Sequence, residues 1–219
     1  MIIEVNGVTL NYEKTGSGRP LILLHGNGED HRIFDKGIEL LKERFTCYAV
    51  DSRDHGESSA CAKLHYADMA DDMIAFMDAL DLNDVLFYGF SDGGIVGLLA
   101  AMKTDRITTL VTSGANVSPD GVKPMLKTFL KVMRRFSMDS KIELMLNEPH
   151  ITENDLRQIK AKTLVLAGEK DLVTDHETKF IAANIPNATL RFIKGEGHGS
   201  YIVHSTKFVK YLIYADTQL

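Results

Sequence analysis

The chain has 219 residues, of which 44% are hydrophobic and 25% are charged, a composition typical of a globular domain and not of a disordered, collagenous or coiled-coil protein. Its formal net charge of −5 argues against a general nucleic-acid binder and against a polybasic membrane-binding surface, because both need positive charge to meet phosphates. Two cysteines, Cys47 and Cys61, are too few for a disulfide framework, and neither has zinc-ligand spacing, so no metal is expected.

The N-terminal segment and the apolar runs bear on the cellular compartment. Glu4 lies inside the first apolar stretch, and no cleavable hydrophobic region follows basic residues, so we do not expect a signal peptide. The longest apolar run, residues 95–102, contains Gly97 and is too short to span a bilayer. We therefore expect a cytoplasmic protein that contacts neither membranes nor nucleic acid.

Short apolar runs alternate with helical patterns along most of the chain. Residues 1–13 predict a β-hairpin around Asn6-Gly7, because both residues tolerate positive φ. Apolar runs predict strands, covered on both faces, at residues 21–24, 46–50, 85–88, 109–112, 163–167 and 189–193. Helices are predicted between them at residues 33–44, 66–80, 93–102, 177–184 and 201–214. This alternation predicts an α/β fold: a mostly parallel central sheet with an antiparallel N-terminal hairpin and helices on both faces.

Residues 118–162 break the alternation, because they contain helical patterns and no strand-like run. Helices are expected near residues 125–136 and 140–146, and a third begins at Thr152, with Asp155 three residues on. We therefore divide a single domain into a core, residues 1–117 and 163–219, and a small helical cap, residues 118–162.

The first cap helix has an apolar face and a basic face. The apolar face carries Met125, Phe129, Val132, Met133 and Phe136. The cap methionines Met125, Met133, Met138 and Met145 predict an adaptable lining for a pocket, or a small core under the cap. Its basic residues favour a solvated helix face over an attraction for anionic substrates: Lys123, Lys127, Lys131, Arg134 and Arg135.

A strand, a sharp turn and a helix surround the pentapeptide Gly89-Phe90-Ser91-Asp92-Gly93. This is a G-x-S-x-G sequence in the context that presents a nucleophilic serine above the edge of a sheet. The glycines are needed because the backbone of the serine is strained and its neighbours come too close for a Cβ. Ser91 is therefore the predicted nucleophile, and the alternative is a glycine-rich turn with an incidental serine.

A serine hydroxyl is a weak nucleophile, so it needs a base that is itself oriented by a carboxylate. His198 follows the predicted strand 189–193 between two glycines, and Asp171 follows the strand 163–167, which gives the chain order serine, acid, histidine. A capping histidine and a capping turn aspartate are the structural alternatives. The weaker candidates are His176 and His204 for the base and Glu169 and Asp175 for the acid.

The oxyanion that forms when the serine attacks needs hydrogen-bond donors aimed at it. One donor is expected to be the backbone N–H of Asp92, which follows the nucleophile. The other is assigned to the backbone N–H of Asn27, in the His25-Gly26-Asn27-Gly28 loop after an early strand. His25 itself is interpreted as a buried turn histidine bonded to nearby backbone.

With these residues assigned, the chain resembles proteins of the α/β-hydrolase fold over nearly its whole length. The resemblance rests on HGNG at residues 25–28, DSRDHGES at 51–58 and GFSDGG at 89–94, followed by Asp171 and His198. It implies a Ser-His-Asp hydrolase with a helical cap over its pocket. The Ser-Asp-Gly-Gly elbow is similar to that of esterases related to valacyclovir hydrolase.

Three features depart from the family pattern. Asp54 stands where the segment D-x-R-G-H-G-x-S normally has glycine, and Thr174-Asp175 replaces a proline common after the acid. The cap is shorter than in larger members, which suggests a shallow or open acyl pocket. The loop residues Arg53, Asp54, His55 and Ser58 are interpreted as holding their loop rather than touching substrate.

The sequence thus predicts hydrolysis of a small carboxylic ester through an acyl-enzyme, with a small-molecule acyl substrate and no cofactor. Lactones, thioesters and carbon–carbon bonds remain alternative substrates for the same residues. A ligand-binding sensor that uses the cap as a switch is an alternative of another class. An aspartate-nucleophile hydrolase is excluded, because position 91 is serine.

Overall fold

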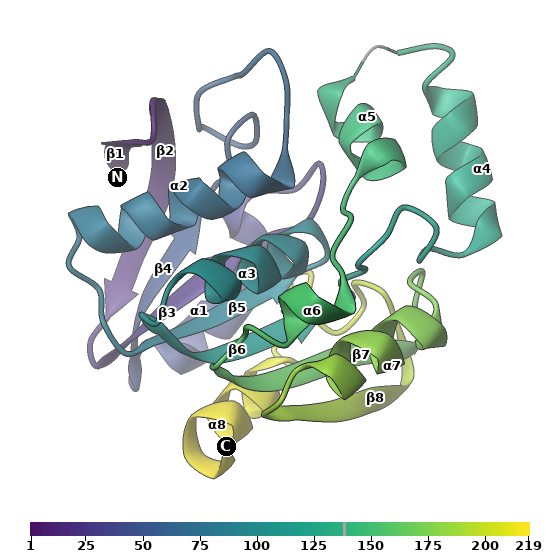
Figure 1. The fold of residues 1–219 in the computed structure, drawn as a ribbon. Coiled ribbons are helices and arrows are strands. Elements are labelled where there is room, and N and C mark those ends of the chain that lie inside the picture. The colour runs from purple at the N-terminus through teal and green to yellow at the C-terminus, as the bar shows by residue number, and fades with distance from the viewer. Residues whose placement is uncertain (138) are drawn as a thin grey trace.

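The computed structural model describes residues 1–137 and 139–219. Its centre is an eight-stranded sheet (Figure 1). The strand order is β1-β2-β4-β3-β5-β6-β7-β8. The strands are β1 (Ile2–Val5), β2 (Val8–Gly16), β3 (Arg19–Leu24), β4 (Phe45–Val50), β5 (Val85–Phe90), β6 (Ile107–Ser113), β7 (Lys162–Lys170) and β8 (Ala188–Gly197).

The first two strands form the predicted hairpin. Val5 pairs with Val8 across Asn6 and Gly7, whose φ angles of 48° and 75° suit the tight turn. β1–β2 and β2–β4 are antiparallel, and every other neighbouring pair is parallel. The predicted fold class is therefore confirmed.

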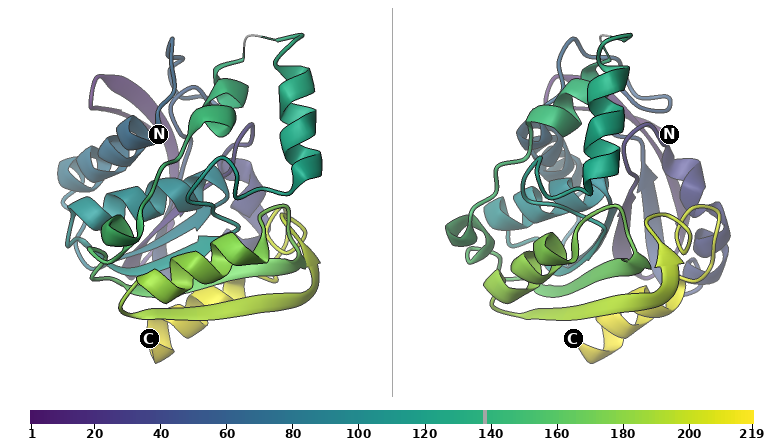
Figure 2. Two further views of the ribbon diagram at one scale, coloured as in Figure 1. Left: turned by 45° about the vertical axis from the view of Figure 1, so that its right-hand side comes forward. Right: turned by 90° about the vertical axis from the view of Figure 1, so that its right-hand side faces the viewer.

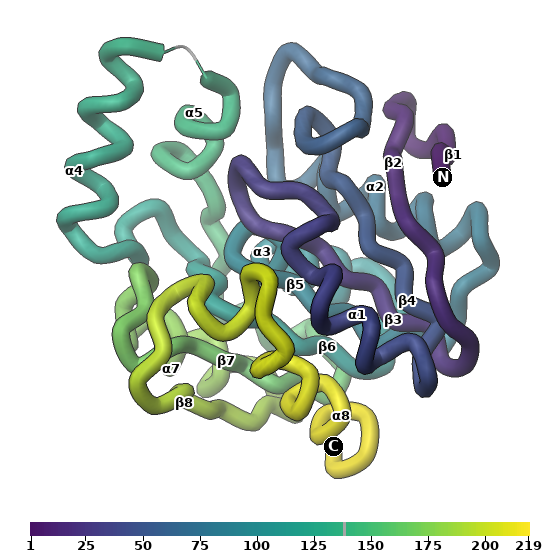
Figure 3. Tube along the Cα trace, turned by 180° about the vertical axis from the view of Figure 1, so that it is seen from behind, coloured from purple at the N-terminus to yellow at the C-terminus, as the bar shows by residue number. Residues whose placement is uncertain are grey.

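Helices cover both faces of this sheet. The helices of the described residues are α1 (Asp35–Leu41) after the 3-10 helix η1 (His31–Phe34), α2 (Tyr66–Ala79), α3 (Asp92–Lys103), α4 (Pro124–Met133), α5 (Ser140–Asn147), α6 (Glu153–Leu156), α7 (Asp175–Asn184) and α8 (Val209–Gln218). α2, α3 and α7 lie on one face, and α1 and α8 lie on the other, as the view from behind in Figure 3 shows. No helix in the described ranges has the length and apolar character to cross a membrane.

Each face of the sheet buries its own hydrophobic core. In β5, Phe87 packs with the α2–α3–α7 side, whereas Leu86 and Tyr88 pack with the α1–α8 side. Successive side chains of a strand point to opposite faces, so a strand covered on both faces must be apolar at every position. This is why the central strands read as uninterrupted apolar runs in the sequence.

The C-terminal helix begins eight residues later than the sequence indicated. Residues 201–208 form turns, and α8 starts at Val209. His204 has a left-handed φ of 48°, which interrupts a helix, and its N–H donates to the carbonyl of Ile33. Tyr201 and Phe208 are fully buried all the same, so their apolar character reflects core packing rather than helical period.

The helical insertion leaves the sheet after β6 and returns at β7. Figure 2 shows α4 and α5 above the sheet, whereas α6 lies beside α3 and α7. Val122 forms an isolated antiparallel bridge with Val173, which ties the start of the insertion to the loop after β7. The part of the insertion that stands over the sheet edge thus consists of α4, α5 and their connections.

Candidate active site

Ser91 sits in a strained turn between β5 and α3. Its φ and ψ are 52° and −115°, a conformation that a non-glycine residue adopts only where its surroundings enforce it. A Cβ on Gly89 would lie 2.1 Å from the carbonyl oxygen of Gly93, and one on Gly93 would lie 2.2 Å from that of Leu24. Glycine at both positions therefore permits the close packing that holds the turn.

Ser91, His198 and Asp171 form a continuous hydrogen-bonded chain. His198 Nε2 lies 3.0 Å from Ser91 Oγ, and His198 Nδ1 lies 2.6 Å from Asp171 Oδ1. The three residues follow β5, β8 and β7, whose carboxyl ends meet at one edge of the parallel sheet. The structure thus brings together three side chains that are up to 107 residues apart in the sequence.

The carboxylate of Asp171 is buried and held by backbone donors. The N–H groups of Gly168 and Val173 donate to it at 3.1 and 3.0 Å. Burial alone would raise the pKa of Asp171, but the hydrogen bond to His198 and the two backbone donors outweigh it and lower the pKa. An ionised Asp171 accepts the Nδ1 proton of His198, which leaves Nε2 free to accept the hydroxyl proton of Ser91.

The imidazole of His198 is confined on two sides. The ring of Phe90 lies 4.9 Å from it, centroid to centroid. On another side is Gly114, with a φ of 63°, where a Cβ would come within 2.8 Å of the imidazole. No local sequence pattern indicated Gly114, because its role depends on a histidine 84 positions further on.

Two backbone N–H groups are available beside Ser91. Within the described residues, the amides of Asn27 and Asp92 make no hydrogen bond to another protein group. The amide of Asp92 belongs to the first turn of α3, where helix N–H groups have no intrahelical partner. Both residues line the cavity next to Ser91 and His198, as expected for donors to an oxyanion.

The side chain of Asp92 has a role that the sequence did not suggest. Its carboxylate is buried and accepts a hydrogen bond from Asn27 Nδ2 at 2.9 Å. Burial raises its pKa, although the hydrogen bonds from Asn27 and the hydroxyl of Tyr66 act in the opposite direction. The carboxylate thereby links the elbow to the loop after β3.

A cavity of about 190 Å³ opens above Ser91 and lies between the sheet edge and the cap. Its walls are mainly apolar and come from the core loops and from α4 and α5: Phe90, Val122, Leu126, Leu130, Met145, Leu172 and Val173. Its charged lining is acidic, from Glu29, Asp92 and Glu148, and no lysine or arginine lines it in the part of the chain that the structure describes.

Of the methionines expected to line a pocket, Met125 and Met133 of α4 do not: Met125 is 77% exposed and Met133 is 37% exposed. The other apolar residues of the predicted helix face also face solvent: Phe129 and Val132 in α4, and Phe136 in the turn that follows it. Leu126 and Leu130 cover the cavity instead, because they lie about 100° around the helix from that stripe. Met145 of α5 does line the cavity, and Met138 lies outside the described residues.

The weaker candidates lie away from the hydrogen-bonded chain. His176 stacks on Phe180 in α7, and Asp175 pairs with Lys179 on the same exposed helix surface. Glu169 accepts from the N–H of Gly195. None of these groups lines the cavity.

His25 has the structural role that the sequence indicated. Its Nε2 accepts the N–H of Ser52 at 3.0 Å, and its Nδ1 lies 2.7 Å from the carbonyl oxygen of Gly26. Burial lowers its pKa to about 4. A neutral imidazole therefore joins the loops after β3 and β4.

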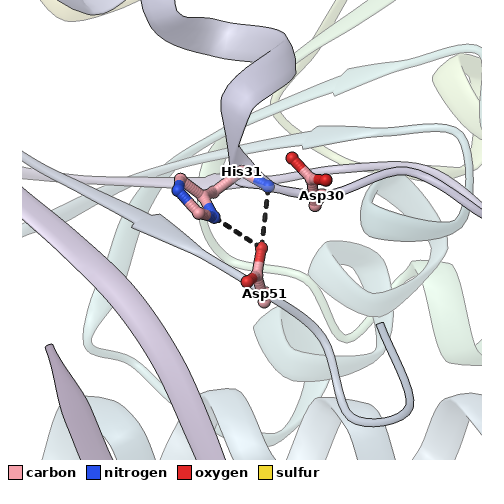
Figure 4. A group of neighbouring side chains, drawn as sticks. All are labelled: Asp30, His31 and Asp51. Atoms are coloured by element: carbon pink, nitrogen blue, oxygen red, sulfur yellow. Dashed lines mark hydrogen bonds and ion pairs between the residues drawn. The ribbon is translucent and has the colours of Figure 1, made fainter. Parts of the chain in front are cut away.

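The loop 51–58 is held by polar contacts rather than aimed at the cavity. Asp51 joins Asp30 and His31 in a cluster whose oxygen and nitrogen atoms are close enough to hold a metal ion (Figure 4). Both Asp51 oxygens are already occupied, Oδ1 by the N–H and Nδ1 of His31 and Oδ2 by Asn11 and the N–H of Glu57. The cluster is therefore best explained as a set of hydrogen bonds that holds this loop against η1.

Arg53 and Ser58 make further contacts that hold the loop, to α2 and within the loop itself. Arg53 donates to both carboxylate oxygens of Asp72 at 2.5 and 2.6 Å, and Ser58 donates to the carbonyl of Asp51. His55 Nδ1 contacts the carbonyl of Arg53. These contacts support the interpretation that the loop residues hold structure.

Known proteins of this architecture resemble the chain in sequence. A profile of the alpha/beta hydrolase fold matches residues 19–142. The chain is 28% identical to the AB hydrolase superfamily protein YisY of Bacillus subtilis (strain 168), over 91% of this chain and 92% of that protein. It is 27% identical to the serine hydrolase BPHL of Homo sapiens, over 95% of this chain and 83% of that protein.

Solved structures resemble it in fold. An esterase (EaEST) from Exiguobacterium antarcticum superposes with a TM-score of 0.83 at 23% identity, covering 99% of both chains. The enol-lactonase from Burkholderia xenovorans LB400 superposes with a TM-score of 0.82 at 20% identity, covering 100% of both. Since the family profile spans more than half of the chain and the fold agrees throughout, the protein belongs to the α/β-hydrolase fold family.

Proposed function

We propose that this protein is a serine hydrolase that cleaves small carboxylic esters through an acyl-enzyme. The observation that carries the proposal is the unbroken hydrogen-bonded chain from Ser91 through His198 to Asp171, which ends in a cavity. Two backbone amides without protein partners lie beside the serine. A nucleophile, a base, an orienting acid and oxyanion donors are the parts that acyl transfer needs.

In the first half-reaction, Ser91 Oγ attacks the carbonyl carbon while its proton passes to His198 Nε2. The carbonyl oxygen becomes an oxyanion, which accepts hydrogen bonds from the N–H groups of Asn27 and Asp92. The tetrahedral intermediate then collapses and breaks the bond to the alcohol oxygen. The imidazolium donates its proton to that oxygen, and Asp171 stabilises the imidazolium until the transfer occurs.

In the second half-reaction, water takes the place of the alcohol. His198 removes a proton from the water as it attacks the acyl carbon, and the oxyanion forms again at the same two amides. Collapse breaks the bond to Ser91 Oγ, which regains its proton from His198. The products are the carboxylic acid and a free enzyme.

The cavity supports a small acyl group without negative charge. Its volume is about 190 Å³ and its walls are mainly apolar, which favours short aliphatic chains. Three carboxyl groups line it, whereas Lys127 and Arg134 of the basic cap surface form ion pairs with Asp120 and Glu143 outside it. A butyrate ester should therefore be cleaved faster than the corresponding half-ester of succinate.

Intact-protein mass after incubation with a small fluorophosphonate tests the proposal. The wild type should gain one phosphonyl group, and Ser91→Ala and His198→Ala should gain none, while Ser205→Ala, at a residue outside the site, labels like the wild type. An ester panel with lactones and thioesters included then identifies the bond. Flat activity on every ester together with lactone turnover would replace the ester assignment. A folded wild type that takes no label would instead favour the ligand-binding sensor.

A further inference from the structure

Asp54 is a departure from the family pattern that the proposed chemistry does not use. Its φ is 62°, in the left-handed region, where glycine is free of steric cost and aspartate is tolerated. The position therefore suits the glycine that the family pattern has there. A carboxylate in its place calls for a contact that only a side chain can make.

The carboxylate of Asp54 reaches the first turn of α5. Its Oδ2 accepts a hydrogen bond from Ser140 Oγ at 2.8 Å and from Lys141 Nζ at 2.9 Å. The Asp54 and Lys141 side chains are only 17% and 22% exposed, so solvent screens this pair less than a surface ion pair. Burial would raise the pKa of Asp54, but the contacts with Lys141 and Ser140 outweigh it and lower the pKa.

The same turn of α5 touches the loop that carries an oxyanion donor. The carbonyl oxygen of Lys141 accepts from Asn27 Nδ2 at 3.3 Å, and the same amide group donates to Asp92 Oδ2 at 2.9 Å. A carbonyl only accepts hydrogen bonds, so the amide nitrogen of Asn27 must face α5. The side chain of Asn27 thus connects α5 with Asp92. Asn27 and Asp92 are the two residues whose backbone N–H groups are the proposed oxyanion donors.

The other end of α5 is fastened separately. Glu148 accepts from the N–H of Tyr66 at 3.1 Å and lies 2.5 Å from His65 Nδ1. Removal of the Asp54 contact would therefore free the N-terminal turn of α5, next to Asn27, without releasing the whole helix.

We propose that Asp54 is a positioning residue, which holds the first turn of α5 against Asn27 and so orients the oxyanion donors of Asn27 and Asp92. This inference rests on the proposed function of the two amides. It predicts that the contact between cap and core acts on kcat and not only on substrate binding, because the oxyanion exists only after attack has begun.

Asp54→Gly separates this role from folding. Glycine adopts a φ of 62° without strain, which offsets part of the lost contact, so the variant should remain folded with a single cooperative transition in urea. Its kcat should fall about tenfold, with a change in KM of less than about threefold, because misplaced donors weaken the transition state. Asp54→Asn, which keeps an acceptor for Ser140, should lose less, and Lys141→Met should resemble Asp54→Gly.

The matched control is Arg134→Gln, which breaks another ion pair of α5, that between Arg134 and Glu143 on the exposed side of the cap. This variant should keep the wild-type kcat.

Hydrogen–deuterium exchange provides a readout that does not depend on activity. Asp54→Gly should exchange faster than the wild type in residues 24–29 and 140–147, and Arg134→Gln should not in residues 24–29. Wild-type exchange in Asp54→Gly, or faster exchange with an unchanged kcat, would overturn the proposal. If the wild type neither cleaves esters nor takes a fluorophosphonate, the proposed function fails, and exchange in residues 24–29 still decides whether Asp54 positions the loop.

Discussion

The sheet edge that carries Ser91 and the cap above it differ in the kind of contact that holds each of them in place. At the sheet edge, backbone atoms pack against glycines, and backbone N–H groups hold the carboxylate of Asp171. In the cap, α5 is fastened by a few side-chain contacts from Asp54 and Glu148, and α4 exposes an apolar stripe. The proposed catalytic residues thus lie on the part held by backbone packing, and the part that covers the cavity is held by contacts that single substitutions can remove.

The largest effect is expected at the sheet edge, from Asp171→Asn. An amide in place of the carboxylate favours the wrong imidazole tautomer, so kcat should fall by about 10³–10⁴-fold while the fold is kept. Asp175→Asn, four residues further on in the exposed first turn of α7, is the matched control and should keep wild-type kcat. Steady-state kinetics on a short acyl ester checks this, and a loss below tenfold in Asp171→Asn would mean that another acid orients His198.

Gly114→Ala tests whether catalysis depends on the close packing of the His198 imidazole against residue 114. The new Cβ would lie 2.8 Å from the imidazole, so we expect kcat to fall about a hundredfold. Gly195→Ala also places alanine at a positive φ, of 78°, but its Cβ would meet nothing within 4 Å. Both variants should lose about 1 kcal/mol of unfolding free energy from the backbone, and only Gly114→Ala should lose activity. Equal kcat values in the two would contradict this account.

The free energy of unfolding should also depend on pH, because His25 is buried. Burial lowers its pKa from 6.5 to about 4 in the folded protein, so the unfolded chain binds a proton first as the pH falls. The stabilisation is complete above about pH 6.5 and is lost progressively towards pH 4, which amounts to about 2 kcal/mol between about pH 8 and pH 5. Urea unfolding at these two values should show that loss in the wild type. A loss of the same size in His25→Gln would exclude His25 as its source.

The smallest effect is expected at the exposed apolar residues of α4 and of the turn that follows it, which contains Phe136. Phe136→Ser should change the unfolding free energy by less than about 0.5 kcal/mol, because the side chain is 83% exposed. Leu130→Ala on the cavity side of the same helix should cost about 2 kcal/mol, since Leu130 is only 6% exposed. Urea unfolding of both variants compares the two faces, and a larger cost for Phe136→Ser would mean that the stripe is covered in solution.

The sequence alone was informative wherever a few neighbouring residues decide the structure. The hairpin at Asn6-Gly7, the apolar central strands and the turn around Ser91 depend on local backbone preferences and on a period of two or 3.6 residues. The order of Ser91, Asp171 and His198 after strands of a parallel sheet was enough to propose that they meet. For the hairpin, the strands and the turn, the physical cause is local, whereas the meeting of the three side chains could be proposed because each follows a strand of the same parallel sheet.

Only the tertiary structure determined which side chains are buried, where the last helix begins and which distant residues meet. The helical period predicted an apolar face through Met125 and Phe129, but packing against the sheet edge placed the neighbouring Leu130 over the cavity instead. A left-handed His204 delayed the last helix by eight residues because core packing of Tyr201 and Phe208 outweighed helical propensity. The contact of Asp54 with Lys141 joins residues 87 positions apart, and no local pattern encodes a contact at that distance.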